Sequence, residues 1–241
     1  MFERIPRDLP GYELRYAVVD DGSADDTFAA AERVRSKLPS LTLLRHPQNR
    51  GYGGAVKTLL SHALETNAAV TVILHADGQY SPEKLPELLA PLAAGTADLV
   101  QGSRMLGGGA LAGGMPLYKY AANRLLTAIE NRAFGMRMAE FHSGYMLYAR
   151  VALASIPFRR LSDSFDFDLE MLVCARILGL RIAEVAIPTI YADEVSHLKP
   201  IAYGWDVLRI VRRFRRGVYA AMLKDPGASD GRATAAIGAG R

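Results

Sequence analysis

The chain has 241 residues, half of them hydrophobic, which suffices for one large α/β domain or two small ones. Lys and Arg number 29 against 25 Asp and Glu, an excess too small to indicate nucleic-acid binding by itself. The single cysteine, Cys174, excludes an intramolecular disulfide and fits a reducing compartment. The first residues lack an apolar secretory core, and no run of 18 apolar residues predicts a membrane span.

The first hundred residues alternate between predicted strands and predicted helices. Because the strands are apolar almost throughout, they are typical of a parallel sheet buried on both faces. The alternation predicts a doubly wound α/β sheet, in which ligands bind outside the carboxyl ends of the strands. We expect strands at 14–23, 41–46, 68–77 and 98–104, and helices at 25–38, 53–66 and 81–95.

The second half is less regular, and the last residues differ in composition. After a glycine-rich loop at 107–115, we expect helices at 117–134, 163–178 and about 203–223, and strands at 142–149 and 181–188. The tail 225–241 is small and polar, which predicts disorder. Residues 1–224 are therefore expected to form one domain.

Acidic side chains follow two of the predicted strands. Asp20 and Asp21 end the first strand, and Asp77 ends the third. Acids that converge from separate strands suit a divalent cation carrying phosphates, here Mg²⁺ or Mn²⁺. The alternative is turn and cap chemistry, since Asp, Gly and Ser favour turns, and Ser23 with Asp26 resembles a capping box.

Two further motifs lie at the same predicted edge. Gly51 and Gly53 precede a helix, but Val56 stands where a dinucleotide fingerprint needs its third glycine, and no phosphate P-loop is present. These glycines approach a ligand, allow close packing of helix and strand, or do both. Arg104 ends the fourth strand, where it can neutralise a diphosphate or can simply be a surface arginine.

The order of six segments resembles the family 2 glycosyltransferases of the GT-A fold, nearest the dolichyl/polyprenyl-phosphate mannosyltransferase group. These segments are VVDDGSADDT, NRGYGGA, HADGQYSPE, QGSR, SGYMLYAR and FDFDLEMLVCARILGLRIAEVAIPT, within residues 14–200. The resemblance implies a GT-A, Rossmann-like, mostly parallel sheet flanked by helices. It also implies metal-assisted transfer of a sugar from a nucleotide-diphosphate donor, of the GDP-mannose or UDP-glucose type, to a polyprenyl phosphate.

The resemblance also assigns residues. Asp77 takes the metal-binding position of a D-x-D motif, and Arg104 helps to hold the phosphates. His75 replaces the first acid of that motif; a neutral imidazole can ligate Mn²⁺, or it can be a hydrogen-bonded histidine at the sheet rim. The donor is expected to meet Asp20, Asp21, Asn49, Gly51, Gly53 and Gln79, and the acceptor Ser143 and Arg124.

Three acids, Asp166, Asp168 and Glu170, bear on the acceptor chemistry. A hydroxyl acceptor needs a carboxylate base, for which we favour Asp166. A lipid phosphate needs little base, because its second pKa lies near about 6. The alternative for the three acids is a solvated helix N-terminus favoured by the helix dipole.

The last predicted helix bears on localisation. Val207, Val211, Phe214 and Val218 form an apolar stripe beside five arginines. Such a helix can lie peripherally on the cytoplasmic face of an anionic membrane. The alternative is that the stripe packs on the protein and the arginines face water.

The family opens with a strand that ends in a P-x-Y-N-E-like motif, and this motif has no counterpart among residues 1–14. We therefore expect the N-terminal strand, which in the family lies inside the sheet beside strand 14–23, to be missing. Two alternative functions remain open at this point. One is a transferase to a glycan hydroxyl in polysaccharide synthesis, and the other is a truncated, non-catalytic remnant.

Overall fold

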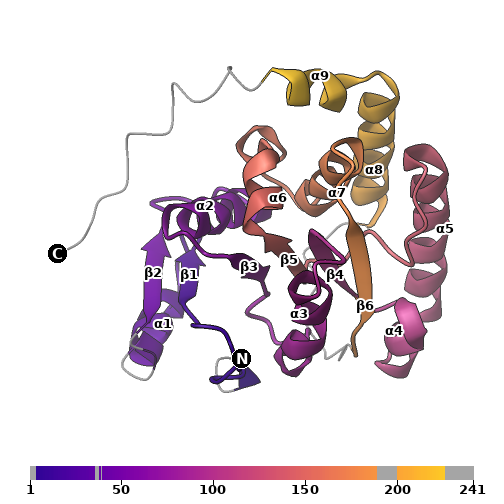
Figure 1. The fold of residues 1–241 in the computed structure, drawn as a ribbon. Helices are drawn as coiled ribbons and strands as arrows, with labels where there is room; N and C mark the ends of the chain where they lie inside the picture. Colours follow the sequence, from indigo (N-terminus) through magenta and orange to yellow (C-terminus); the bar gives the residue numbers. More distant parts are fainter. Residues whose placement is uncertain (1–3, 36–37, 39, 189–199, 226–241) are drawn as a thin grey trace.

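The computed structural model describes residues 4–188, apart from 36, 37 and 39, and residues 200–225 (Figure 1). The predicted tail beyond residue 225 lies outside this part. The first half follows the expected alternation, with η marking 3₁₀ helices. Its elements are β1 (Tyr16–Asp20), α1 (Thr27–Arg35), β2 (Leu41–Arg45), α2 (Tyr52–Glu65), β3 (Val70–Ile73), η2 (Pro82–Lys84), α3 (Leu85–Ala93) and β4 (Leu99–Ser103).

The second half contains short helices that the sequence pattern did not predict. The glycine-rich loop holds η3 (Leu106–Gly108) and α4 (Gly109–Ala112), and two more short helices follow β5. In chain order the remaining elements are α5 (Leu117–Phe134), β5 (Met146–Ala149), α6 (Arg150–Ser155), η4 (Phe158–Arg160), α7 (Phe167–Ile177), β6 (Ile182–Ala186), α8 (Pro200–Arg215) and α9 (Val218–Lys224).

The strands form two sheets rather than one. β1 and β2 pair in parallel, whereas β3, β5, β4 and β6 form a four-stranded sheet in that order. Within it β5 runs antiparallel to both neighbours, and β4 pairs with β6 in parallel. The α/β class with flanking helices is thus confirmed, but the sheet is mixed where a mostly parallel one was predicted.

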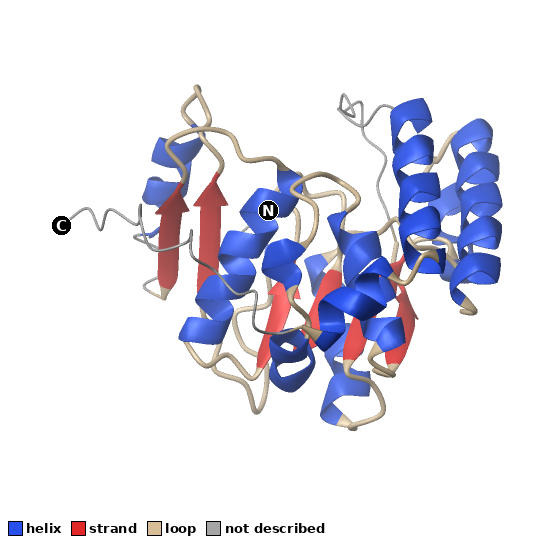
Figure 2. Cartoon of the chain, turned by 90° about the horizontal axis from the view of Figure 1, so that it is seen from above, coloured by secondary structure: helices blue, strands red, loops and turns tan. Residues whose placement is uncertain are grey.

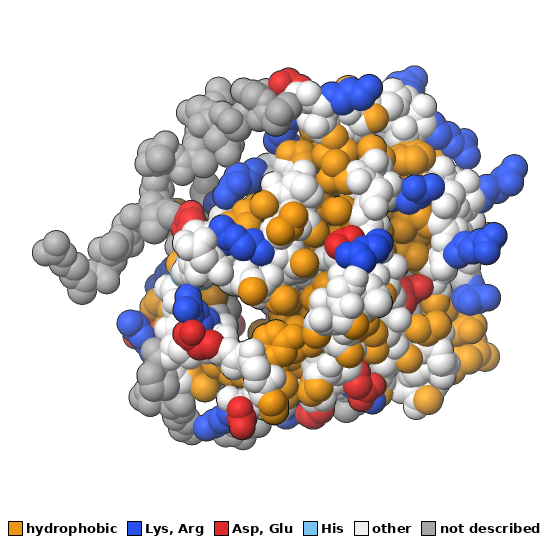
Figure 3. Space-filling model, viewed as in Figure 1, with side chains coloured by type: hydrophobic (Ala, Val, Ile, Leu, Met, Phe, Trp, Pro, Cys, Tyr) orange, Lys and Arg blue, Asp and Glu red, His pale blue; other side chains and the backbone are white. Residues whose placement is uncertain are grey.

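The break between the two sheets lies between β1 and β3. Both ribbon views place β1 next to β3, with α2 alongside both (Figures 1 and 2). The space-filling view is hollowed at this place (Figure 3). The resemblance predicts an additional interior strand beside β1, and no described residue supplies one.

The core lies on both faces of the four-stranded sheet. On one face, Leu99, Met146 and Tyr148 join the cluster formed by α2, α7 and α8. On the other face, Val100 and Leu147 pack with α3. This alternation follows from the two-residue period of side chains along a strand. The sheet therefore holds α7 rigidly, and every residue from Phe167 to Ala175 is buried.

The predicted terminal helix is two helices. Gly217 has a left-handed backbone (φ 70°) and separates α8 from α9. Val207 and Val211 of the apolar stripe are buried, because α8 packs beside α5 and α7 (Figure 1). The packing alternative is therefore correct for Val207 and Val211, whereas Phe214 is partly buried and Val218 is exposed. No helix in the described part of the chain combines the length and apolar character needed to cross a bilayer.

Candidate functional site

A pocket of about 530 Å³ opens where β1 ends and α2 begins. Its other wall is the segment that precedes α7. Phe165 stacks on Tyr52 at this wall, with ring centroids 5.7 Å apart and 12° between the ring planes. The lining residues are Asp21, Asn49, Gly51, Tyr52, Ser162, Asp163, Ser164 and Phe165. Three of the residues predicted to meet the donor, Asp21, Asn49 and Gly51, are therefore brought together.

The two acids after β1 have different roles. The carboxylate of Asp20 is buried, accepts a hydrogen bond from Ser23 N (3.1 Å) and pairs with Arg45 (3.0 Å). Asp21 Oδ1 accepts from Arg50 N (2.9 Å) and lies 2.6 Å from Nδ1 of His46. Asp21 thus fixes the loop before α2 and also faces the pocket, whereas Asp20 does turn chemistry.

The glycines at the start of α2 allow a close approach to the segment before α7. Gly53 N donates to Asp163 O (2.9 Å), and a Cβ on Gly53 would overlap the carbonyl oxygen of Ser162. Gly51 has φ 82°, and a Cβ there would lie 2.6 Å from Asp163 O. Gly53 therefore allows close packing, although its partner is the segment before α7 and not a strand as predicted. Gly51 packs in the same way and also lines the pocket.

Asp77 and Gln79 lie in the turn after β3. Asp77 is exposed, and its Oδ1 accepts a hydrogen bond from Gln79 N (3.0 Å). One carboxylate oxygen therefore shapes the turn. A second ligand role for Asp77 is compatible with this geometry because a carboxylate has about four lone-pair sites.

His75 is enclosed by aromatic rings. Its ring lies edge-on to those of Tyr52 and Tyr80, each with a centroid distance of 5.2 Å. Nε2 lies 3.1 Å from the Tyr52 hydroxyl, and a Cβ on Gly144 would overlap Nε2. Burial lowers the pKa of His75 below its ordinary value; Asp77 raises it and Arg104 lowers it further. The neutral form of the imidazole is therefore favoured, and Nε2 is the nitrogen that meets Tyr52.

Arg104 is held by protein groups rather than standing at the surface. Its Nη2 lies 2.7 Å from Glu140 Oε2 and donates to His142 O (2.6 Å). Glu140 is fully buried and also accepts from the backbone N–H groups of Arg104 and Met105. The surface alternative for Arg104 is thus wrong. An approaching diphosphate would have to share the guanidinium with Glu140.

The two predicted acceptor residues lie in different surroundings. Ser143 is buried, and its hydroxyl donates to Gly102 O (2.5 Å) at the end of β4. Arg124 is exposed on α5. The structure therefore gives Ser143 a role in tying the chain before β5 to β4. The acceptor roles of both residues stay predictions.

The three acids at the start of α7 are buried, so the solvated-terminus alternative is wrong. Burial, opposed by a hydrogen bond from Tyr52, raises the pKa of Asp168 to about 7. None of the three carboxylates stands free in the pocket as a general base. The hydrogen bonds and ion pairs are Asp166 with Ser162 and Arg209, Asp168 with Tyr52, and Glu170 with Ser162, Arg213 and Tyr219.

Several residues at the site escaped the sequence interpretation. Tyr52 and Phe165 form pocket walls, and Lys57 reaches across to Asp163 (2.8 Å). Tyr52 lies inside the NRGYGGA motif, so its position beside the glycines was a usable signal. Asp163 contributes its backbone carbonyl to Gly53 and its carboxylate to Lys57, and no local sequence pattern reveals either contact.

The site can accommodate a divalent cation only together with a ligand. No group of three His, Cys, Asp or Glu side chains with metal-binding geometry occurs among the described residues. Mg²⁺ is commonly held by one or two carboxylates plus substrate phosphates, and the exposed carboxylate of Asp77 fits that arrangement. Asp77, two residues after His75, would hold a cation that arrives with a diphosphate.

Comparison with known proteins gives the chain a family. The model of the family described as "Glycosyl transferase family 2" matches residues 3–156, which is more than half of the chain. An uncharacterised protein of Methanocaldococcus jannaschii is 32% identical over 82% of this chain and 79% of its own length. The undecaprenyl-phosphate mannosyltransferase of Micrococcus luteus is 33% identical over 70% of this chain and 69% of its own.

A solved structure shows the same fold. Glucosyl-3-phosphoglycerate synthase from Mycobacterium tuberculosis, in complex with Mn²⁺, UDP and phosphoglyceric acid, superposes with a TM-score of 0.57. The match covers 95% of this chain and 74% of that chain at 20% sequence identity. This likeness supports the fold, while the family rests on the sequence matches.

Proposed function

Because the chain belongs to glycosyl transferase family 2, we propose that it transfers a sugar from a nucleotide-diphosphate donor to a polyprenyl phosphate. The pocket between β1 and the segment before α7 carries this proposal. It joins Asp21, Asn49 and Gly51 to Tyr52, whose hydroxyl touches His75, two residues before Asp77. A donor nucleotide in this pocket would direct its diphosphate toward Asp77.

The departing diphosphate needs its developing negative charge neutralised. A divalent cation supplies that neutralisation when bound, and Asp77 is the side chain placed to hold it. Arg104 adds a second positive charge behind His75. The relative named as an undecaprenyl-phosphate mannosyltransferase supports sugar transfer. The solved structure in complex with Mn²⁺ and UDP supports the use of a cation with the donor diphosphate.

The choice of acceptor rests on the three acids at the start of α7, which are the candidate bases predicted from the sequence. Asp166, Asp168 and Glu170 are buried and hydrogen-bonded, so none of them is placed to deprotonate a sugar hydroxyl. A phosphate monoester is already largely anionic near pH 7 and attacks without such help. The names of relatives that act on undecaprenyl or dolichyl phosphate agree with this choice.

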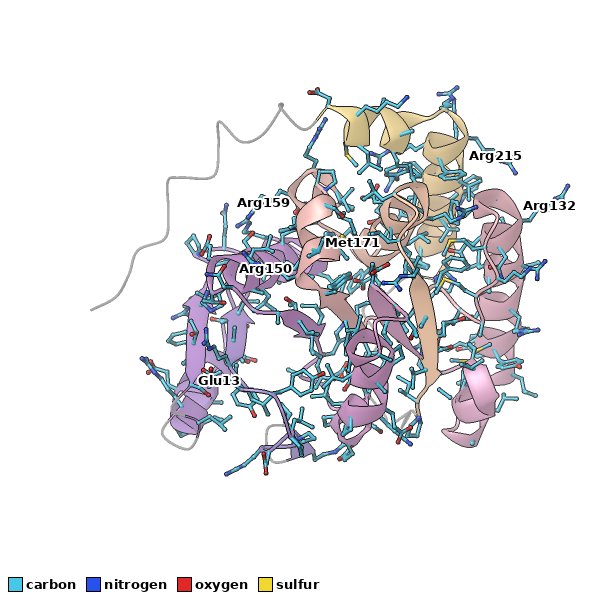
Figure 4. The ribbon with its side chains drawn as sticks, in the orientation of Figure 1. Glu13, Arg132, Arg150, Arg159, Met171 and Arg215 are labelled. Carbon is cyan, nitrogen blue, oxygen red and sulfur yellow. The ribbon has the colours of Figure 1, made fainter. Side chains whose placement is uncertain are left out.

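Peripheral membrane contact belongs to the same proposal, because a polyprenyl phosphate is anchored in a bilayer. Arg132 of α5 and Arg215 of α8 point away from the body at one edge of the molecule (Figure 4). Lys and Arg side chains are frequent along this edge (Figure 3). Such an edge can attract the anionic cytoplasmic leaflet.

Calorimetry on the purified protein tests the donor site. UDP-glucose and GDP-mannose are titrated with and without Mn²⁺. Asp77→Asn should weaken Mn²⁺-dependent binding roughly tenfold or more, about 1.4 kcal/mol, because it removes the ligand charge. Glu32→Gln removes an exposed carboxylate from α1 and serves as the matched control. Equal Mn²⁺-dependent binding in wild type and Asp77→Asn would contradict the metal assignment.

The acceptor is tested by the transfer of labelled sugar. Polyprenyl phosphate and the corresponding dephosphorylated polyprenol are offered in parallel vesicles. We expect label in the organic phase only with the phosphate. Transfer to a soluble glycan instead would replace the acceptor proposal, and the absence of both transfer and donor hydrolysis would favour the remnant.

A further inference from the structure

The segment before α7 presents a carboxylate to the pocket. Asp163 lines the pocket, and 63% of its side chain is exposed. Its backbone carbonyl oxygen accepts hydrogen bonds from Gly53 N (2.9 Å) and Gly54 N (3.4 Å) at the start of α2. The main chain of Asp163 is therefore fixed, while its carboxylate stays open to a ligand.

A lysine from α2 fixes the carboxylate as well. Lys57 Nζ lies 2.8 Å from Asp163 Oδ1 and also donates a hydrogen bond to the carbonyl oxygen of Leu161. Only 9% of the Lys57 side chain is exposed. A buried ammonium needs such partners, because an unpaired one costs far more free energy. Lys57 therefore holds both residue 161 and the Asp163 carboxylate in place.

The two ends of this ion pair differ in exposure. A carboxylate that only neutralises Lys57 could be buried together with it, but the carboxylate of Asp163 faces the pocket. A carboxylate has two oxygens with about four lone-pair sites, and Lys57 meets Oδ1. Lone pairs thus remain for a ligand, and binding there needs little further ordering of the protein because Asp163 is already held.

The lining of the pocket favours hydroxyl groups over phosphates. Its described residues include two carboxylates, Asp21 and Asp163, and no lysine or arginine. A carboxylate repels a phosphate, but it accepts hydrogen bonds from hydroxyl groups.

An aromatic ring adjoins this carboxylate. Phe165 is 46% exposed, and one face of its ring stacks on Tyr52. Apolar contact area next to a few fixed polar groups is typical of a small-molecule site. A hydroxylated ring with apolar C–H groups, such as ribose or a hexose, can use both the aromatic side chain and the carboxylate.

We propose that Asp163 accepts hydrogen bonds from vicinal hydroxyl groups of the donor, and that Lys57 is the positioning residue that holds Asp163 for this task. The inference rests on the proposed function, because the ligand is taken to be a sugar nucleotide. Such a donor carries vicinal hydroxyls on its ribose and on the sugar that is transferred. Both sources offer the same chemistry to Asp163, and the experiment separates them.

Calorimetry in the presence of Mn²⁺ compares ligands with and without these hydroxyls. The ligands are UDP, dideoxy-UDP, which lacks both ribose hydroxyls, and UDP-glucose, together with the corresponding guanosine series that ends in GDP-mannose. We define hydroxyl selectivity as the Kd of the ligand without the hydroxyls divided by the Kd of the ligand with them. Dideoxy-UDP against UDP reports on the ribose, and UDP against UDP-glucose reports on the transferred sugar.

Asp163→Asn tests the carboxylate. Asparagine keeps an oxygen for Lys57 but replaces the other carboxylate oxygen with an NH₂ group, which cannot accept. Hydroxyl selectivity should fall roughly tenfold, because a hydrogen bond to a charged acceptor is lost. If ribose is the source, UDP and UDP-glucose bind more weakly and dideoxy-UDP binds as before. If the transferred sugar is the source, only UDP-glucose binds more weakly.

Two further variants complete the test. Lys57→Met should lower the same hydroxyl selectivity, whereas a lysine that only supports the fold would shift the Kd values of all ligands together. Glu32→Gln, which removes an exposed carboxylate from α1, is the matched control and should leave hydroxyl selectivity unchanged. Unchanged hydroxyl selectivity in Lys57→Met would overturn its positioning role.

The wild-type protein alone can also contradict the inference. Equal Kd values for all three ligands of the series that binds would overturn it without any variant. Unaltered hydroxyl selectivity in Asp163→Asn, with thermal unfolding at the wild-type temperature, would overturn it as well, and both results leave the transferase proposal standing. Wild type that binds no ligand of either series would contradict the proposed function and this inference together.

Discussion

At the scale of single residues, Gly53 holds the amino end of α2 against the segment before α7. Its N–H binds Asp163 O, and the space for a Cβ is taken by the Ser162 carbonyl. Gly204 in α8 is the contrasting case, since a Cβ there would meet nothing within 4 Å. Substitution by alanine should therefore change the stability of the protein in opposite directions at these two helical glycines.

Gly53→Ala should lower the free energy of unfolding by about 1–3 kcal/mol, because backbone atoms must move to admit the methyl group. Gly204→Ala should raise it by roughly 0.5–1 kcal/mol, since alanine loses less entropy in a helix. Urea unfolding of both variants measures the two changes. A neutral Gly53→Ala would mean that the close contact with Ser162 yields easily.

Some of the site residues could be predicted from the sequence, and the environment of others could not. Asp21, Asn49 and Gly51 were predictable because side-chain type or glycine at a strand end carries the signal. The burial of Asp166, Asp168 and Glu170 was not predictable, because their partners Tyr52, Arg209 and Arg213 lie more than 40 positions away. Local patterns favour a solvated helix end, and tertiary contacts overrode that preference.

At the scale of elements, α8 shows how much of a helix's environment an amphipathic sequence pattern can predict. The pattern identifies the apolar face but not what covers it. Here the face packs on α5 and α7, and Arg213 turns inward to Glu170, which leaves Arg212, Arg215 and Arg216 exposed. The break at Gly217 carried a recognisable signal, since glycine favours the left-handed position after a helix.

If α8 helps to hold the protein on anionic lipid, the exposed arginines should carry the attraction. Replacing Arg212, Arg215 and Arg216 with Gln should weaken sedimentation with phosphatidylserine vesicles roughly 100-fold at low salt, at about 1 kcal/mol per charge. A control with Arg7, Arg35 and Arg159 replaced, all exposed elsewhere, has the same net charge. Equal loss in both triple variants would indicate net charge alone rather than a binding edge.

At the scale of the whole molecule, the antiparallel β5 is the main departure from the mostly parallel sheet that was predicted. The order of strands and helices was predictable from apolar runs and turn residues. The antiparallel direction of β5 was not, because a strand pattern carries no direction. Among the described residues, β1 pairs with β2 and has no ladder with β3, which leaves a break in the hydrogen bonding between the two sheets.

Amide hydrogen exchange can test directly whether the two sheets are separate between β1 and β3. Amides of β1 and β3 that point toward it have no ladder partner among the described strands, whereas those of β4 lie between two neighbours. We expect the outward amides of β1 and β3 to exchange roughly 100-fold faster or more than those of β4. Comparable protection of all three strands would show that the two sheets are joined in solution.

The divided sheet also gives the pocket walls that belong to two different sheets. Asp21 belongs to the small sheet, whereas Ser162 and Phe165 belong with α7 and the large sheet. α2 contacts both sheets, and the hydrogen bond from Gly53 N to Asp163 O joins its amino end to the second wall. A nucleotide that contacts both walls would reduce the motion of one sheet relative to the other. Donor binding should then stiffen regions far from the ligand, and looser hinging should shorten the residence time of the donor before it alters the chemical step.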